Sequence, residues 1–187
     1  MRQKVAAVLM MMTLLLSSCA AGNNHLRDAL TFREKLLESG SCRFTAKITA
    51  EVQERGYVFL LESACKEDTA SVRVLAPESI ADISAQITSM DATISFDGVG
   101  LTFGTMDDVM TSPLYLPWLL NACWRSAYID CAGVDGEYLR VTYRYGTGEE
   151  ELILETWFSE LTPICAEVYR KERLLLSAEL EGFTFGA

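Results

Sequence analysis

Twelve consecutive residues, 42 to 53, alternate strictly between apolar and polar side chains. The apolar members of the alternation are Cys42, Phe44, Ala46, Ile48, Ala50 and Val52. Side chains of a strand point to opposite faces in turn, so this period of two predicts a long strand with one buried face. One hairpin is at best marginally stable alone, and such a strand therefore requires a sheet of several neighbours.

The neighbours are predicted to follow in two groups along the chain. Strands are expected over residues 57–65, 69–76, 84–89, 93–97 and 100–104, and again over 139–145, 151–158, 164–170 and 173–182. Asp97-Gly98 is a hairpin signal. The short connections predict an antiparallel meander of about ten strands.

Helices are predicted at two places. Asn23 or Asn24 can cap an amphipathic helix that starts near His25 and stops at Gly40. Between the two groups of strands, Thr105 to Asp108 resembles one helix start and Ser112-Pro113 resembles another, and Pro117 should keep these helices short or kinked. An α+β fold follows, in which the helices cover one face of the sheet.

Composition excludes several classes of partner. The chain has 26 acidic and 16 basic side chains and a net charge of −10. No basic surplus is available to replace the counterions of a nucleic acid, so no nucleic-acid partner is expected. Electrostatic attachment to anionic lipid is disfavoured for the same reason.

The first residues predict a signal peptide. Arg2 and Lys4 precede an apolar run from Val5 to Leu16, interrupted only by Thr13. Twelve helical residues extend about 18 Å, which is too short to cross roughly 30 Å of hydrocarbon. This length is typical of the apolar region of a secretory signal.

The signal ends in Leu16-Ser17-Ser18-Cys19, which resembles a bacterial lipobox. The resemblance implies cleavage before Cys19 and attachment of acyl chains to its thiol. We therefore expect a signal peptide over residues 1–18, a lipidated Cys19 with a short tether over residues 19–24, and one domain over residues 25–187. The expected location is the cell envelope, on the extracytoplasmic side of a bacterial membrane.

Several segments of the domain resemble the LolA/LolB superfamily of bacterial lipoprotein carriers and receptors, whose fold the sigma-factor regulator domain of the RseB type shares. They are Phe44 to Val52, Val72 to Pro77, Phe96-Asp97-Gly98 with Leu101, Ser112-Pro113, Trp157 to Pro163, and Ala166 to Tyr169. The resemblance implies an unclosed half-barrel of about eleven strands. It also implies helices over the concave face and an apolar cavity between helices and sheet.

The resemblance further implies binding of lipid, acyl chains or a lipidated protein, without catalysis. Candidate cavity-wall residues are Phe44, Ile48, Val52, Val72, Val74, Leu139, Val141 and Tyr143. Candidate residues of a mobile lid are Leu114, Leu116, Trp118 and Leu119. The alternative for both sets is ordinary core. The alternative function is a protein-interaction or sensory module of the envelope with the same fold and no lipid ligand.

No residue pattern predicts a catalytic or metal centre. His25 is the single histidine, and the chain has no C-x-x-C pair and no G-x-S-x-G or S-x-x-K motif. We expect no enzyme activity, no cofactor, no metal, and a monomer.

Two cysteine pairings can be weighed from the sequence. If Glu54 pairs with Tyr57, Cys65 faces Ala46 and cannot reach Cys42. Cys123 and Cys131 are then the better candidates for a disulfide, with buried free thiols as the alternative.

Overall fold

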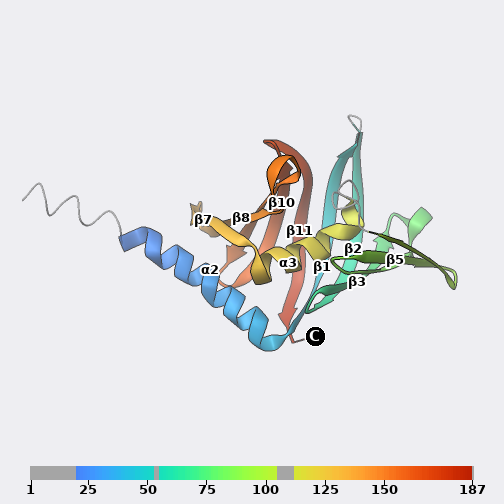
Figure 1. Ribbon diagram of the computed structural model, residues 1–187, viewed down its shortest axis with the longest axis horizontal. Helices are drawn as coiled ribbons and strands as arrows, with labels where there is room; N and C mark the ends of the chain where they lie inside the picture. Colours follow the sequence, from blue (N-terminus) through green and yellow to red (C-terminus); the bar gives the residue numbers. More distant parts are fainter. Residues whose placement is uncertain (1–19, 53–54, 105–111, 187) are drawn as a thin grey trace, which may run out of the picture.

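The computed structural model describes residues 20–52, 55–104 and 112–186. Eleven antiparallel strands form a single sheet in the order β6-β5-β4-β3-β2-β1-β11-β10-β9-β8-β7 (Figure 1). The strands are β1 (Ser41–Val52), β2 (Arg55–Lys66), β3 (Thr69–Ala76), β4 (Ser84–Ile87), β5 (Asp91–Phe96), β6 (Val99–Gly104), β7 (Tyr128–Asp135), β8 (Tyr138–Tyr145), β9 (Leu152–Ser159), β10 (Thr162–Arg170) and β11 (Arg173–Phe185).

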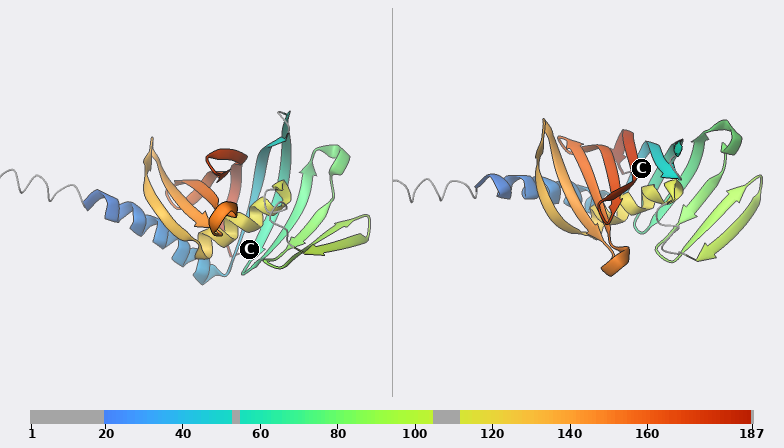
Figure 2. Two further views of the ribbon diagram at one scale, coloured as in Figure 1. Left: turned by 45° about the horizontal axis from the view of Figure 1, so that its top comes forward. Right: turned by 90° about the horizontal axis from the view of Figure 1, so that it is seen from above.

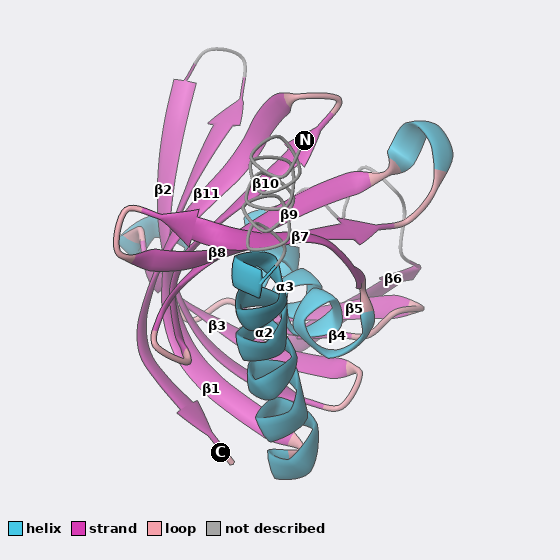
Figure 3. Cartoon of the chain, turned by 90° about the vertical axis from the view of Figure 1, so that its left-hand side faces the viewer, coloured by secondary structure: helices cyan, strands magenta, loops and turns pink. Residues whose placement is uncertain are grey.

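The helices are α2 (Ala20–Ser39) and α3 (Leu116–Ser126), with short 3-10 turns η2 (Glu78–Ile80), η4 (Pro113–Tyr115) and η5 (Gly148–Glu150). Pairing of β1 with β11 joins the two meanders, and β6 and β7 are the two edges of the sheet. The sheet curves around α3, and α2 runs along its open side (Figures 2 and 3). The predicted α+β fold with an unclosed, half-barrel sheet is confirmed.

Strand β7 is the one strand that the periodicity missed. Its side chains do not alternate between buried and exposed positions, and it includes Asp130, Cys131, Gly133 and Asp135. An edge strand has a neighbour on one side only, so fewer of its positions need an apolar side chain. The alternation of apolar and polar side chains is therefore weak in β7, although the segment forms a strand.

Both predicted helix details need correction. Asn23 and Asn24 lie inside α2 and do not cap it, because the helix includes every residue from Ala20 onward. Residues 20–24 of the expected tether are thus helical, whereas Cys19 and the segment 105–108 lie outside the described residues. Pro117 lies in the first turn of α3, where its missing N–H has no intrahelical partner to lose, so α3 continues for eleven residues. Neither helix in the described ranges is long and apolar enough to span a bilayer.

The core lies between the inner face of the sheet and the two helices. Phe32 of α2 is fully buried, with its ring centroid 5.7 Å from that of Trp124 of α3 and 4.7 Å from that of Phe158 of β9. The Trp124 indole donates a buried hydrogen bond to the Thr156 hydroxyl at 3.1 Å. One aromatic cluster thus fixes both helices on the second meander.

The register of the first hairpin differs from the prediction. Val52 pairs with Arg55, and in consequence Cys42 lies directly opposite Cys65, not four residues away. Both side chains are buried and free, so the separation expected from sequence is wrong. The alternative pair fails too, because Cys123 is a buried free thiol of α3 and Cys131 is an exposed free thiol of β7.

These positions predict very different thiol reactivities. The thiol of Cys42 and burial raise the pKa of Cys65 well above its ordinary value, and burial raises that of Cys123. Because the thiolate is the reactive form, we expect maleimide to modify exposed Cys131 in the folded protein and to reach Cys42, Cys65 and Cys123 only after denaturation. Mass spectrometry of the labelled protein checks this. Labelling of Cys65 as fast as Cys131 would contradict the described packing.

Candidate functional site

The inner face of the sheet is apolar along most of its width and is the candidate binding surface. Most of the candidate wall residues lie on it and are buried, with exposed fractions of 0–2%: Phe44, Ile48, Val72, Val74, Val141 and Tyr143. Leu139 is half-buried against the same core. Val52 is in β1, but its side chain lies outside the described residues.

The proposed lid residues occupy this inner face. Leu116, Trp118 and Leu119 of α3 are buried to 1% exposure or less, and Leu114 of η4 packs partly buried beside them. Helix α3 contacts β2 and β3 on one side and β8 on the other. The wall and lid residues therefore meet, and in the described structure they fill the space between them as core.

Polar contacts at its C-terminal end hold α3 in this position. The Arg33 guanidinium of α2 donates to the backbone carbonyls of Trp124 (2.8 Å), Cys123 (3.2 Å) and Ala127 (2.7 Å). These carbonyls belong to the last turn and C-cap of α3. The Cys123 carbonyl also accepts the backbone N–H of Ala127 at 3.2 Å, so Arg33 is a second donor there, and it supplies a donor to the carbonyls of Trp124 and Ala127. A cation is also favoured at the negative end of the helix dipole.

Helix α3 in turn has an arginine, Arg125, that donates hydrogen bonds at the end of α2. The Arg125 guanidinium donates to the carbonyls of Leu36 (3.5 Å) and Gly40 (3.4 Å), at the C-terminal end of α2. Farther along α3, the Trp118 indole donates to the Asp68 carbonyl (3.0 Å) and the Asn121 amide to the Glu67 carbonyl (2.8 Å). Side chains of α3 thus bind both α2 and the β2–β3 turn.

Arg33 and Arg125 were not among the candidates drawn from sequence. Arg33 interrupts an otherwise apolar helical stripe, and this was the available signal that it has a partner inside the protein. Its guanidinium carbon lies 6.0 Å from the ring centroid of Tyr143, whose phenol pKa is raised by burial. Among the described side chains, no group of three His, Cys, Asp or Glu residues is placed to hold a metal ion.

Among the residues that the structure describes, no element covers the part of the apolar inner face that extends past α3. In β6, Val99, Leu101 and Phe103 are 67%, 64% and 42% exposed, and Phe96 of β5 is 54% exposed. Leu101 pairs with Ile94 and Phe103 with buried Ala92, so the row lies on the inner side of the sheet. We call these four residues the uncovered row. The β5–β6 hairpin that carries it projects beyond the end of α3 (Figure 2).

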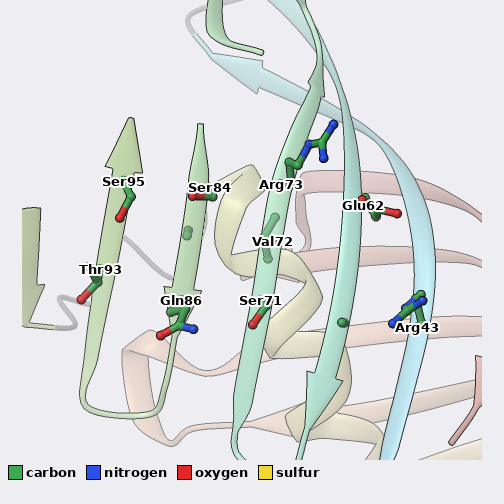
Figure 4. Close-up of a pocket in the computed structure, with 11 residues that line it drawn as sticks. Arg43, Glu62, Ser71, Val72, Arg73, Ser84, Gln86, Thr93 and Ser95 are labelled. Carbon is green, nitrogen blue, oxygen red and sulfur yellow. The ribbon is translucent and has the colours of Figure 1, made fainter. Parts of the chain in front are cut away.

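A groove of about 530 Å³ lies on the opposite, outer face of the first meander (Figure 4). Most of its lining side chains are hydroxyl, amide or charged groups, and they include Arg43, Glu62, Arg73, Ser84, Gln86 and Ser95. Such a lining suits water or a polar ligand. An acyl chain bound there would remove water from these polar groups without replacing their hydrogen bonds, which is unfavourable. The groove therefore does not serve the function that the sequence suggested.

No known family description matches this chain, and no curated protein matches it in sequence. Solved structures with a similar course of the chain include a LolA superfamily protein from Nitrosomonas europaea. It is 11% identical, over 84% of this chain and 93% of that one, with a TM-score of 0.47.

A putative outer membrane lipoprotein-sorting protein domain from Vibrio parahaemolyticus is 9% identical over 88% and 93% of the two chains, with a TM-score of 0.47. The lipoprotein LppX of Mycobacterium tuberculosis is 8% identical over 83% and 94%, with a TM-score of 0.35. Likenesses at these levels do not identify a ligand or a partner, so the function of this chain rests on its own residues.

The contacts of Arg33 predict a large effect of a substitution that keeps its apolar stem. Arg33→Met removes three hydrogen bonds to carbonyls at the end of α3, of which the Cys123 carbonyl keeps the N–H of Ala127, and we expect it to lower the free energy of unfolding by about 3 kcal/mol. The control Arg27→Met, at an exposed position of the same helix, should change it by less than about 0.5 kcal/mol. Urea unfolding measures both. Equal stabilities of the two variants would contradict the role of Arg33.

Proposed function

We propose that this protein is a membrane-anchored, non-catalytic lipoprotein of the bacterial envelope that binds a lipid or acyl chain on the concave inner face of its sheet. The observation that carries the proposal is the uncovered row. Phe96, Val99, Leu101 and Phe103 expose apolar surface, and Leu101 and Phe103 pair with Ile94, which packs against the core, and with Ala92, which belongs to it. An acyl chain laid along this row would stay in contact with apolar side chains throughout, and its burial would be favourable.

The arrangement of α3 supports a role for its movement in binding. Helix α3 fills the inner face with apolar side chains, and its C-terminal end is fixed by the guanidinium of Arg33. A ligand longer than the uncovered row would have to displace α3 from the sheet. The exchange replaces one apolar contact by another, so its main cost is the loss of the polar contacts of Arg33, Trp118 and Asn121.

The anchor follows from the lipobox-like end of the signal sequence. Two acyl chains on Cys19 would hold the protein durably, whereas one chain binds a membrane only marginally. Helix α2 already includes Ala20, so a rigid element would begin one residue after the anchor. The domain would then remain close to the membrane surface.

A second function is favoured by a separate observation. The candidate wall residues are packed against α3 and not against an empty space. A filled core with an exposed apolar surface also suits an envelope module that binds another protein. The two functions differ in whether the isolated protein retains lipid.

Native mass spectrometry of residues 20–187, purified without detergent from cells and then mixed with phospholipid, tests the first function. We expect a protein–lipid mass. Leu101→Asp places a charge on the uncovered row and should lower the bound fraction at a fixed lipid concentration about tenfold.

Val58→Asp is the matched control. Val58 is 52% exposed, and it pairs with Thr49 on the outer side of the sheet, so its substitution should leave lipid binding unchanged. A lipid-free mass for the unsubstituted protein, under conditions that saturate a known lipid binder, would favour the protein-interaction module.

The anchor has its own test. Cys19→Ala removes the thiol to which the acyl chains would attach, and we expect the protein to leave the membrane fraction or to remain there only as the uncleaved precursor. Cell fractionation and the mass of the N-terminal peptide distinguish these outcomes. A Cys19→Ala chain that has the mass of the cleaved protein and still stays bound to membranes would contradict the proposed lipidation.

A further inference from the structure

Strand β6 ends the sheet with both faces and one edge open. Among the described residues it pairs with β5 alone, and all six of its residues are exposed. The other edge strand, β7, has structural features that hinder pairing with a further strand, and β6 lacks them. It contacts α2, has an irregular register between Ile129 and Cys131, and bears Asp130, which forms an ion pair with Arg144 at 3.0 Å. The register of β6 is regular, and its sequence Val-Gly-Leu-Thr-Phe-Gly has no charge and no proline.

The turn before β6 determines which backbone groups face outward. Asp97 and Gly98 have φ of 49° and 78°, as in a two-residue hairpin turn of type I′. The flanking residues Phe96 and Val99 then form a hydrogen-bonded pair, and such pairs alternate along the ladder. The N–H and C=O groups of Gly100, Thr102 and Gly104 consequently point away from β5.

The same alternation places small side chains beside these outward groups. Two of the three residues are glycines, and the Thr102 hydroxyl is hydrogen-bonded to that of Thr93 at 2.8 Å on the outer face. A further strand could therefore approach the edge without a steric barrier. On the inner face it would meet Val99, Leu101 and Phe103.

From this geometry we infer that β6 pairs antiparallel with β6 of a second copy of the chain, in place of the monomer expected from sequence. The strand is self-complementary about Leu101. Two apolar residues, Val99 and Phe103, flank it at equal distance, and Gly100 and Thr102 lie between.

One register between the two copies allows both backbone hydrogen bonds and apolar side-chain contacts. Gly100 of each copy forms hydrogen-bonded pairs with Thr102 of the other, which uses outward groups only. Leu101 then lies opposite Leu101, and Val99 opposite Phe103, at non-hydrogen-bonded positions where side chains come closest. A twofold axis perpendicular to the sheet relates the copies, so both inner faces lie on the same side and the interface is isologous.

A second copy fits this edge better than an arbitrary strand for two reasons. The apolar pattern of β6 matches its own reverse, and the contact strand has no charge although each chain has a net charge of −10. The inference does not require a lipid ligand, because the backbone groups at the edge of β6 form the pairing.

A symmetric cysteine cross-link in the full-length chain, in its native membrane, tests the inference. The background substitution Cys131→Ser removes the exposed thiol of β7. With Leu101→Cys added, two thiols face one another across the twofold axis, and we expect most of the protein to run as a reducible dimer after mild oxidation. The control Val134→Cys introduces a thiol at a residue that is 61% exposed on the opposite edge strand, and it should give at least about tenfold less dimer.

A backbone variant separates edge pairing from chance collision. Thr102→Pro removes an N–H that points away from β5, so it should leave the fold intact and lower the cross-linked fraction of the Leu101→Cys chain at least fivefold, roughly a 1 kcal/mol effect. Thr102→Pro on its own, with Leu101 retained, should not change lipid binding, because it leaves all four residues of the uncovered row in place. A monomeric Leu101→Cys chain, a cross-link that survives Thr102→Pro in a folded protein, or a cross-link to a different protein would each overturn the second-copy interface.

Discussion

The C-terminal carbonyls of α3 lie inside the molecule, and the position of the helix depends on the donor that reaches them. Arg33 of α2 supplies three hydrogen bonds there, and Arg125 of α3 supplies two to the end of α2. Leaving such carbonyls unpaired would cost more than the net gain from an average hydrogen bond. Arg33 of α2 thus supplies donors at the end of α3, whereas the Leu36 and Gly40 carbonyls that Arg125 contacts also accept the backbone N–H groups of Gly40 and Glu67.

The second constraint is the width of the sheet. Eleven strands at roughly 4.8 Å spacing extend about 48 Å along the curve, whereas the eleven residues of α3 extend about 16 Å. Even with α2 beside it, the helix cannot cover the whole apolar inner face. Among the described residues, the uncovered row of Phe96, Val99, Leu101 and Phe103 is the part that stays open. The proposed lipid binding and the proposed edge pairing both rest on this mismatch, one through the face of β6 and the other through its edge.

Sequence patterns predicted the elements that bury a full face and failed where a contact crosses between elements. The alternation around Phe44 and Ile48 gave β1 correctly, and the buried wall residues lie on the expected side of the sheet. Strand β7 was missed because an edge position requires little alternation. The register of Cys42 against Cys65 was wrong because a shift in the turn moves every later pair, which periodicity cannot detect.

The sequence by itself determined the antiparallel meander, its apolar face, and the helix that precedes it, since these follow from local periodicity and turn residues. Whether the inner face is empty or filled was decided only by the tertiary structure, because Leu116, Trp118 and Leu119 meet the wall residues through contacts between distant segments. The partner of Arg33 was likewise invisible in sequence, since its carbonyl acceptors are backbone atoms about 90 residues away and leave no side-chain signature.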